Sequence, residues 1–410
     1  MTAWFIPATE DVLLQRALLH LGLNKAVRYY RELVVPGIGG VWFVRQLSWA
    51  AAGIYLATME GQDTSKAEIA HAIEALACKL IWLKNNAESI RGKRAFARYP
   101  DEYSYKNLTQ INKYYVQVTF RQSSVRALMD LGLTEGGMRF NSMELTPSGE
   151  AMVNAFLDNE NNISIKKSLR NWIGGNKYPK SGKQFEYLGS KKASLAEKEI
   201  LRDRLHADSI DEISDTERRK RLIDAFGKRN ILNMPKIDDI KKNLNGTCKQ
   251  QTKEIETAEA FDEMLSTARD LVHNTAEAME NSTSKPIKNF LSSNEIKDNI
   301  EKEISASKKY LLRTEKSQKP HRDALCFAKA IMDKKNQKEE VLKEIVQRDG
   351  VILSVSDGKI HRGSLFDRRR QNYNDEELDD EIGAEENSTK EKIRQLFTLC
   401  RDCINDKKQD

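Results

Sequence analysis

Apolar residues in this chain recur at the spacing of an α-helix, and this periodicity limits the fold more than any other feature. Between residues 65 and 86, apolar side chains return every three or four positions, so one face of a helix would be buried. These side chains are Ile69, Ile73, Leu76, Leu80 and Leu83. Only 8 Pro and 21 Gly occur in 410 residues, which favours long helices over elaborate loops. We therefore expect a mainly α-helical protein.

The same periodicity predicts helices along most of the chain. In the N-terminal part they cover residues 9–21, 24–33, 41–59, 65–86 and 103–115. Beyond residue 190 they cover residues 194–206, 215–228, 235–244, 256–280, 293–311, 320–348 and 388–405. Asp357-Gly358 stands between two short apolar runs, which is a strong signal for one β-hairpin in an otherwise helical region.

Large apolar side chains are concentrated near the N-terminus. All five Trp occur in the first 172 residues, whereas Lys, Glu, Asp and Asn dominate beyond residue 190. This distribution predicts a helical N-terminal domain of normal size, followed by an elongated charged helical region. The expected divisions are a domain over 1–160, a basic aromatic linker over 161–192, a charged helical region over 193–348, and a hairpin, acidic segment and terminal helix over 349–410.

Charge and cysteine content restrict the cellular setting. The 67 basic and 61 acidic residues nearly balance, and five scattered Cys suit free thiols in a reducing cytosol. The N-terminal residues lack the pattern of a secretory signal. The apolar segment Val41–Met59 is interrupted by Arg45 and Gln46, so its continuous part is too short to cross a bilayer of roughly 30 Å. We expect a cytoplasmic protein without a membrane partner.

The stretch Leu131–Met152 interrupts the helical pattern. A helix over 123–131 would end at Gly132 in a left-handed cap, and a Glu-Gly-Gly turn would follow. Residues 138–145 alternate in the manner of a strand, and Thr146 can cap the next helix. A helix, a turn, a strand and a second helix are therefore expected in close succession.

This order of elements resembles the C-terminal half of a winged-helix domain, over about residues 104–157. In that family a Gly-Leu pair follows the recognition helix, a wing hairpin comes next, and a Leu-Thr-x-x-Gly step closes the unit. The matching residues here are Leu131, Gly132, Leu133, Leu145, Thr146 and Gly149. The resemblance implies that the helix from Ser123 enters a major groove, with Arg121 and Arg126 facing DNA and Arg139 on the wing. Many winged helices instead bind only proteins.

The electrostatic signal for nucleic acid lies further along the chain. Residues 1–160 hold 17 basic and 16 acidic residues, whereas 164–192 hold eight basic residues against Glu186 alone. Aromatic residues are interleaved there, and such a pattern can neutralise phosphates and stack on bases. A solvated linker whose aromatic residues pack on the core is the alternative. The candidate nucleic-acid-binding residues are Arg121, Ser123, Arg126, Arg139, Lys166, Lys167, Arg170, Trp172, Lys177, Tyr178, Lys180 and Lys183.

The sequence contains no pattern that predicts a catalytic, cofactor or metal site. Neither a phosphate-binding GxxxxGK[ST] loop nor a GxGxxG motif occurs, and Cys400-x-x-Cys403 lacks the further ligands that zinc needs. Arg269-x-x-x-His273 resembles the Arg-x4–6-His motif of the helical HEPN ribonucleases, with one residue fewer between the two side chains. We expect no cofactor, no metal and no catalytic residue.

Three functional hypotheses follow. The first is a non-catalytic DNA-binding or scaffolding subunit that works with other protein subunits in a bacterial cytosolic system, with phage defence as the expected context. The second is a nuclease-type effector whose site the sequence does not reveal, with His273 or Asp357 as residues to test. The third is a protein-interaction adaptor whose winged helix never contacts DNA. The acidic run over 375–386 could also mimic nucleic acid or bind a basic partner.

Overall fold

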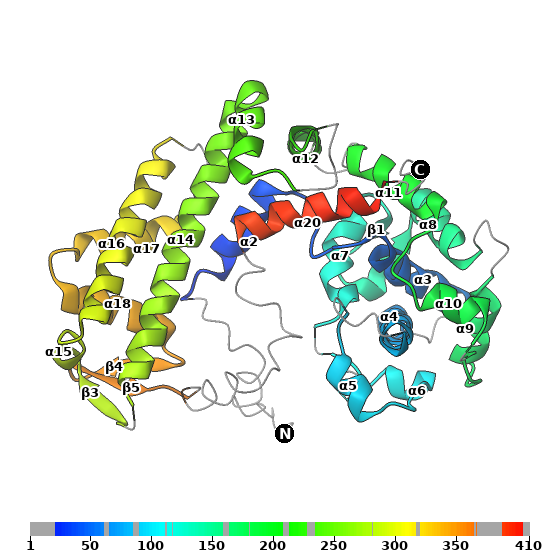
Figure 1. The fold of residues 1–410 in the computed structure, drawn as a ribbon, viewed down its shortest axis with the longest axis horizontal. Coiled ribbons are helices and arrows are strands. Elements are labelled where there is room, and N and C mark those ends of the chain that lie inside the picture. The colour runs from blue at the N-terminus through cyan, green and yellow to red at the C-terminus, as the bar shows by residue number, and fades with distance from the viewer. Residues whose placement is uncertain are drawn as a thin grey trace, which may run out of the picture. The chain divides into compact units, whose positions relative to one another are not determined.

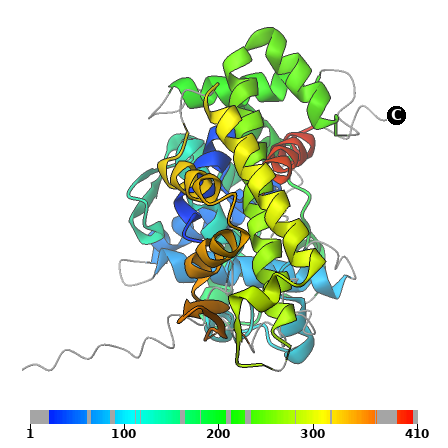
Figure 2. The same cartoon turned by 90° about the vertical axis from the view of Figure 1, so that its left-hand side faces the viewer.

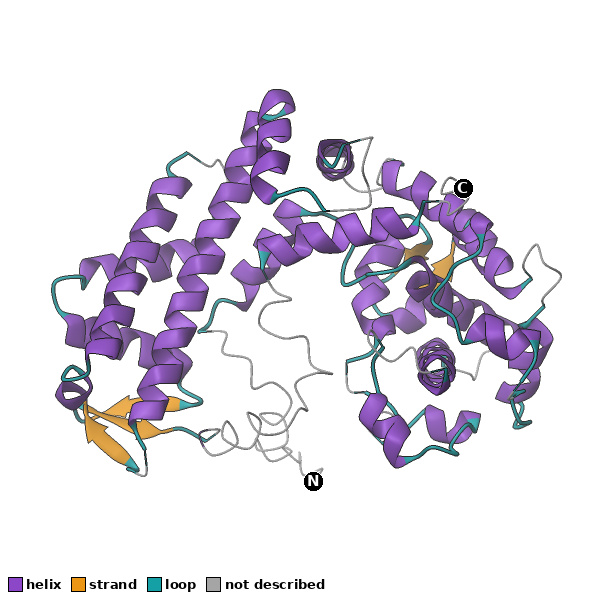
Figure 3. Ribbon diagram, in the orientation of Figure 1, coloured by secondary structure: helices purple, strands orange, loops and turns teal. Residues whose placement is uncertain are grey.

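The computed structural model confirms a mainly α-helical protein with two small antiparallel sheets (Figures 1 and 3). It describes residues 21–60, 65–84, 90–110, 113–116, 118–158, 164–179, 181–207, 213–227, 234–280, 282–316, 320–364, 366 and 388–404. The helix expected over 9–21 falls almost entirely outside the described residues, and the acidic run over 375–386 and Lys180 lie outside them.

The chain divides into two compact units, and each is assembled from segments distant in sequence. Unit 1 comprises residues 1–34 and 249–389, and unit 2 comprises residues 35–248 and 390–410. This division differs from the four consecutive segments expected from composition. Composition along the chain cannot show that an early helix packs with helices more than 200 residues later.

Unit 1 is built on a long antiparallel helix pair. Its helices are α2 (Asn24–Val34), α14 (Lys249–Ala278), α15 (Ile287–Phe290), α16 (Asn294–Thr314), α17 (Arg322–Asp333) and α18 (Lys338–Asp349). Figures 1 and 2 both show α14 and α16 side by side. The Tyr30 ring of α2 lies 4.8 Å from the Phe261 ring of α14, and its hydroxyl is 2.6 Å from that of Tyr310 in α16. These buried aromatic contacts hold α2 in unit 1.

The helix expected over 320–348 is two helices, because the chain turns between Lys334 and Gln337. The hairpin expected at Asp357-Gly358 is confirmed. It joins β4 (Leu353–Ser356) to β5 (Lys359–Arg362), and both turn residues have positive φ, 50° and 69°. Sequence periodicity missed β3 (Ser284–Pro286), which pairs with β5 and gives the sheet order β3-β5-β4.

Unit 2 is centred on two crossing helices, α3 (Val44–Glu60) and α4 (Lys66–Leu83). A Cβ atom built on Gly53 would lie 2.3 Å from Cβ of Ala70, so glycine allows these two helices to approach closely. Trp49 of α3 is buried, as expected for a core helix. Within the described part of the chain, no helix is long and apolar enough to cross a membrane.

The other helices of unit 2 surround this centre. They are α5 (Lys93–Arg98), α6 (Tyr105–Leu108), α7 (Phe120–Asp130), α8 (Pro147–Leu157), α9 (Lys166–Ile173), α10 (Lys183–Leu188), α11 (Leu195–His206), α12 (Ile213–Ala225), α13 (Ile237–Thr247) and, from residue 390, α20 (Thr389–Asp402). The terminal helix α20 belongs here because Asp402 accepts a hydrogen bond from the Val44 amide at 2.7 Å. Gln395 also donates to the Val41 carbonyl at 2.9 Å.

Two expectations in unit 2 are wrong. The helix expected over 103–115 is reduced to the four residues of α6. The buried ammonium of Lys79 binds the carbonyls of Tyr99 and Glu102, and Tyr115 turns inward to stack on Phe96 at 5.7 Å between ring centroids. The linker expected over 161–192 instead contains α9 and α10, and it packs on the core of unit 2.

Candidate nucleic-acid interface

The segment that resembles a winged helix does form a helix, a hairpin and a second helix. Strands β1 (Thr134–Gly136) and β2 (Met143–Leu145) pair antiparallel between α7 and α8. The prediction of a continuous strand over 138–145 is therefore wrong for residues 138–142, and only residues 143–145 form a strand. Residues 137–142 instead connect the two strands, and Phe140 within them is buried.

The residues that carry the resemblance fix the hairpin between its helices. Gly132 has a φ of 64°, in the left-handed conformation expected after α7. Thr146 donates to the Gly132 carbonyl at 2.7 Å and accepts from the Gly149 amide at 3.2 Å. A Cβ atom on Gly149 would lie only 2.0 Å from the carbonyl oxygen of Leu133, so a side chain there would force α8 away from the strand.

The N-terminus of α7 is closed by a carboxylate of the protein itself. Glu74 of α4 accepts hydrogen bonds from the amides of Phe120 and Arg121, each at 2.6 Å. Glu74 is buried, and burial raises its pKa although the two amide donors lower it. Helix N-termini are frequent phosphate sites, but here the free amides already have an acceptor.

Two of the residues expected to face DNA on this helix do not. Arg121 is only 9 % exposed, and its guanidinium lies 5.1 Å from the centre of the Phe140 ring. Burial lowers its pKa, and this side chain cannot reach a phosphate. The Ser123 carbonyl accepts from the Gly40 amide at 2.7 Å, so a glycine loop of unit 2 covers that side of α7. The spacing of residues in α7 could not predict that residues near Gly40 pack against this helix.

Arg126 and Arg139 are exposed, as expected. Arg126 forms an ion pair with Asp130 one turn later, so its charge is partly compensated within α7. Arg139 lies on the loop between β1 and β2, next to Met138, whose side chain is 56 % exposed. The hairpin loop therefore presents an apolar and a basic side chain together.

Two of the three basic residues of α9 lie on its outer face. Lys167 and Arg170 are exposed, whereas Leu169 and Trp172 are buried. Lys177 and Lys183 are also exposed. Lys166 is half-buried, and its ammonium donates to the Tyr55 hydroxyl at 2.8 Å.

Trp172 and Tyr178 are not available to stack on bases. The Trp172 indole donates to the Tyr103 carbonyl at 2.6 Å and meets the Tyr105 ring edge-on at 5.3 Å. Tyr178 is buried as well, and burial raises its pKa. Their expected role at a nucleic-acid surface is wrong, because the same aromatic residues anchor this segment to the core.

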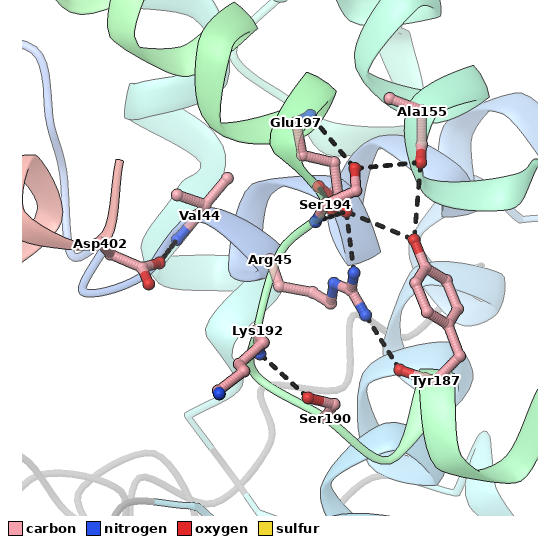
Figure 4. Close-up of polar contacts among 10 residues, drawn as sticks. Val44, Arg45, Ala155, Tyr187, Ser190, Lys192, Ser194, Glu197 and Asp402 are labelled. Atoms are coloured by element: carbon pink, nitrogen blue, oxygen red, sulfur yellow. Dashed lines mark hydrogen bonds and ion pairs between the residues drawn. The ribbon is translucent and has the colours of Figure 1, made fainter. Parts of the chain in front are cut away.

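A buried ion pair fixes the end of the same segment (Figure 4). Arg45 of α3 donates to Glu197 of α11 at 2.8 Å and to the Tyr187 carbonyl at 2.9 Å. The guanidinium also lies 4.2 Å from the centre of the Tyr187 ring. Glu197 accepts further hydrogen bonds from Ser48 at 2.6 Å and from the Ser194 amide at 2.8 Å. The connection from α10 to α11 is thus tied to the centre of unit 2.

The fold adds basic residues that sequence reasoning missed. Arg94 and Arg98 on α5 and Lys106 on α6 are exposed. The Tyr105–Trp172 contact places α6 against α9, and a hydrogen bond of 2.7 Å from Ser168 to Gln184 joins α9 to α10. We name the exposed basic residues on these elements and on the segment between α9 and α10 the basic surface. It comprises Arg94, Arg98, Lys106, Lys167, Arg170, Lys177 and Lys183.

Comparison with protein-family models, curated proteins and solved structures finds no match to this chain. The geometry of its own residues therefore carries the functional argument.

The residues considered for catalysis are engaged in local contacts. His273 Nε2 lies 3.2 Å from the Glu277 carboxylate on the same helix, and Arg269 interacts electrostatically with Asp262, also on α14. Asp357 forms the hairpin turn between β4 and β5. In the ranges that the structure describes, no group of His, Cys, Asp and Glu side chains could hold a metal ion.

Proposed function

We propose that this protein is a non-catalytic subunit that binds the phosphate backbone of DNA through the basic surface. The supporting observation is a set of exposed cations without counter-charges. Six of the seven members form no ion pair among the described residues, namely Arg94, Arg98, Lys106, Lys167, Lys177 and Lys183. Exposed cations of this kind release counterions from DNA when they bind phosphates.

Three basic side chains of unit 1, of which Lys309 is exposed and the other two are half-buried, are paired with acids. Lys309 pairs with Glu263, and Arg313 lies 2.7 Å from Glu256. Lys338 lies 2.7 Å from Glu301. In unit 2, six exposed basic residues of the basic surface form no ion pair with a described residue, although the chain as a whole is nearly neutral with a net charge of +6.

The proposed binding is directed at the backbone and does not require base readout. A recognition helix must present its outer face and side chains to base edges. In α7 the Ser123 side is covered and Arg121 is buried. We propose that the winged-helix-like unit serves as a docking element, with Met138 and Arg139 on its hairpin facing a partner subunit. The multi-protein and phage-defence setting stays a prediction.

Neutralising part of the basic surface should change the salt dependence of DNA binding. For duplex DNA, log Kobs falls with log salt concentration by about 0.9 for each phosphate contact. The double variant Lys167→Gln/Lys183→Gln should therefore have a slope shallower by about 2 than the native protein. Fluorescence anisotropy with a labelled duplex at several salt concentrations measures this slope.

A matched control removes two exposed lysines from unit 1, Lys329→Gln and Lys335→Gln, and should leave the slope unchanged. Absence of DNA binding at low salt would overturn the proposal. Equal slopes for the Lys167/Lys183 variant and the native protein would also exclude α9 and α10 as the contact. Retention of a partner complex without any DNA binding would favour the protein-only adaptor.

A further inference from the structure

The aromatic residues around the basic surface are in contact with one another inside unit 2. Trp172 and Tyr178 are buried, and their rings meet edge-on with 6.4 Å between centroids. Tyr105 of α6 meets the Trp172 ring edge-on at 5.3 Å. Tyr99, directly after α5, meets the Tyr114 ring in the same way at 4.8 Å. Each of these rings therefore packs against another ring of the protein.

Other rings of unit 2 are covered by cations of the protein. The Lys84 ammonium lies 5.2 Å from the centre of the Phe185 ring, and the Lys113 ammonium lies 5.1 Å from that of Tyr114. Every Trp, Tyr and Phe side chain in the described part of unit 2 is buried or half-buried. Proteins that bind single strands stack the bases on exposed aromatic faces. The rings near the basic surface already use their faces and edges for contacts within the fold.

The cations of the basic surface, in contrast, project from helices that pack on one core. Helices α5, α6 and α10 each contact α4. Gln184 of α10 accepts from Ser168 of α9 at 2.7 Å and donates to the Ser164 carbonyl at 3.1 Å. A Cβ atom on Gly189, at the end of α10, would lie 2.9 Å from Cβ of Leu80, so α10 lies close against α4. The positions of these cations are thus set by the packing of unit 2.

Fixed cations without exposed rings favour one form of DNA. A duplex carries one phosphate charge per about 1.7 Å of its axis, and a single strand has about half that density. A single strand also loses conformational freedom when it is ordered on a protein surface. Stacking normally offsets this loss, since each stacked base contributes about ten-fold or more in affinity. At the basic surface this contribution is absent, whereas a duplex already holds its phosphates in place.

We propose that the basic surface selects double-stranded over single-stranded DNA by phosphate charge density, without stacking on bases. Because this selectivity concerns the same residues, it rests on the proposed function and adds the class of DNA to it. It also implies that any binding of a single strand is independent of the base, since every base has the same phosphate backbone.

Fluorescence anisotropy of the native full chain at low salt tests this selectivity with three labelled probes of equal length: a mixed-sequence duplex, oligo-dT and oligo-dA. We expect the duplex to bind at least about ten-fold more tightly than either single strand, and the two single strands to agree within about three-fold. Equal or tighter binding of a single strand would overturn the selectivity and leave DNA binding in place. No binding of any probe would overturn the proposed function and the selectivity with it.

Two variants separate stacking from charge. Tyr99→Leu/Tyr114→Leu removes a pair of half-buried rings near α5 and should leave the affinity for oligo-dT and for the duplex unchanged. Lys167→Gln/Lys183→Gln should weaken the binding of both probes, because both depend on phosphate contacts. A loss of about ten-fold or more for oligo-dT alone in the tyrosine variant would show stacking on these rings and overturn the proposal. Unchanged duplex affinity of the same variant confirms that its fold is intact.

Discussion

Replacing Arg45 by methionine is expected to lower the free energy of unfolding of unit 2 by about 3–5 kcal/mol. The side chains of Arg45 and Glu197 are both 0 % exposed, and their nearest charged atoms are 2.8 Å apart. Without the guanidinium, the Glu197 carboxylate would stay buried with only uncharged donors around it. Removing one partner of such a pair lowers the free energy of unfolding more than removing both partners.

Guanidinium-induced unfolding followed by tryptophan fluorescence measures the change. Four of the five tryptophans, Trp42, Trp49, Trp82 and Trp172, lie in unit 2, so the signal follows mainly that unit. The double variant Arg45→Met/Glu197→Met should recover much of the lost stability, because no charge is then buried.

A matched control uses an exposed ion pair of the same unit. Arg126→Met breaks the pair with Asp130 on α7 and should change stability by about 1 kcal/mol or less. A loss of about 1 kcal/mol or less for Arg45→Met would contradict a stabilising role of the buried ion pair between Arg45 and Glu197. The connection between α10 and α11 would then be held by its apolar contacts.

The parts of the fold that depend on neighbouring residues could be predicted from sequence. Gly132, Thr146 and the Asp357-Gly358 turn act within a few residues, and the structure confirms each. The start of α7 also depends on neighbouring residues, because Thr119 and Gln122 form a capping box. Helix α7 therefore begins at Phe120, three residues before the helix expected over 123–131.

Features that depend on distant residues could not be predicted. The helix expected over 103–115 fails because Lys79, from another helix, binds the backbone carbonyls before it. Strand β3 becomes visible only when it meets β5, more than 70 residues later. A single sequence carries no signal for either contact.

In the candidate interface, too, the features set by neighbouring residues could be predicted and those set by distant residues could not. Clustered lysines predict an exposed basic segment, and the outward side chains of Lys167 and Lys183 agree with it. Interleaved aromatic residues have one sequence pattern but two physical outcomes, stacking on bases or packing on the core. Trp172 packs on the core. Lys106 was missed because α6 reaches the segment only through its contact with α9.

Substituting Glu303 by glutamine is expected to stabilise unit 1 at pH 8 and to have little effect near pH 4.5. Glu303 is 0 % exposed between α14 and α16, and it accepts hydrogen bonds from Thr267 and Ser307. Burial raises its pKa to about 8, although both hydroxyl donors lower it. No cation from the described residues is part of this contact.

The direction of the pH effect follows from the two pKa values. Between the ordinary glutamate pKa of about 4.3 and the folded value of about 8, the unfolded chain releases the proton while the folded chain keeps it. Native stability therefore falls as pH rises through this interval, and the contribution becomes constant above the folded pKa. Each pH unit corresponds to about 1.4 kcal/mol, so the full effect is on the order of 5 kcal/mol.

Glutamine keeps an uncharged group of the same shape at every pH, so the Glu303→Gln variant should lose this part of the pH dependence. The difference in unfolding free energy between variant and native chain, measured from pH 4.5 to pH 9, isolates Glu303. Other buried acids such as Asp262 and Asp349, whose pKa values burial raises to about 6, cancel in that difference. Glu315→Gln, an exposed change at the end of α16, is the control and should give a flat difference. A flat difference for Glu303→Gln as well would mean that the carboxylate is ionised in the folded protein, and that an additional cation or water stabilises it between the helices.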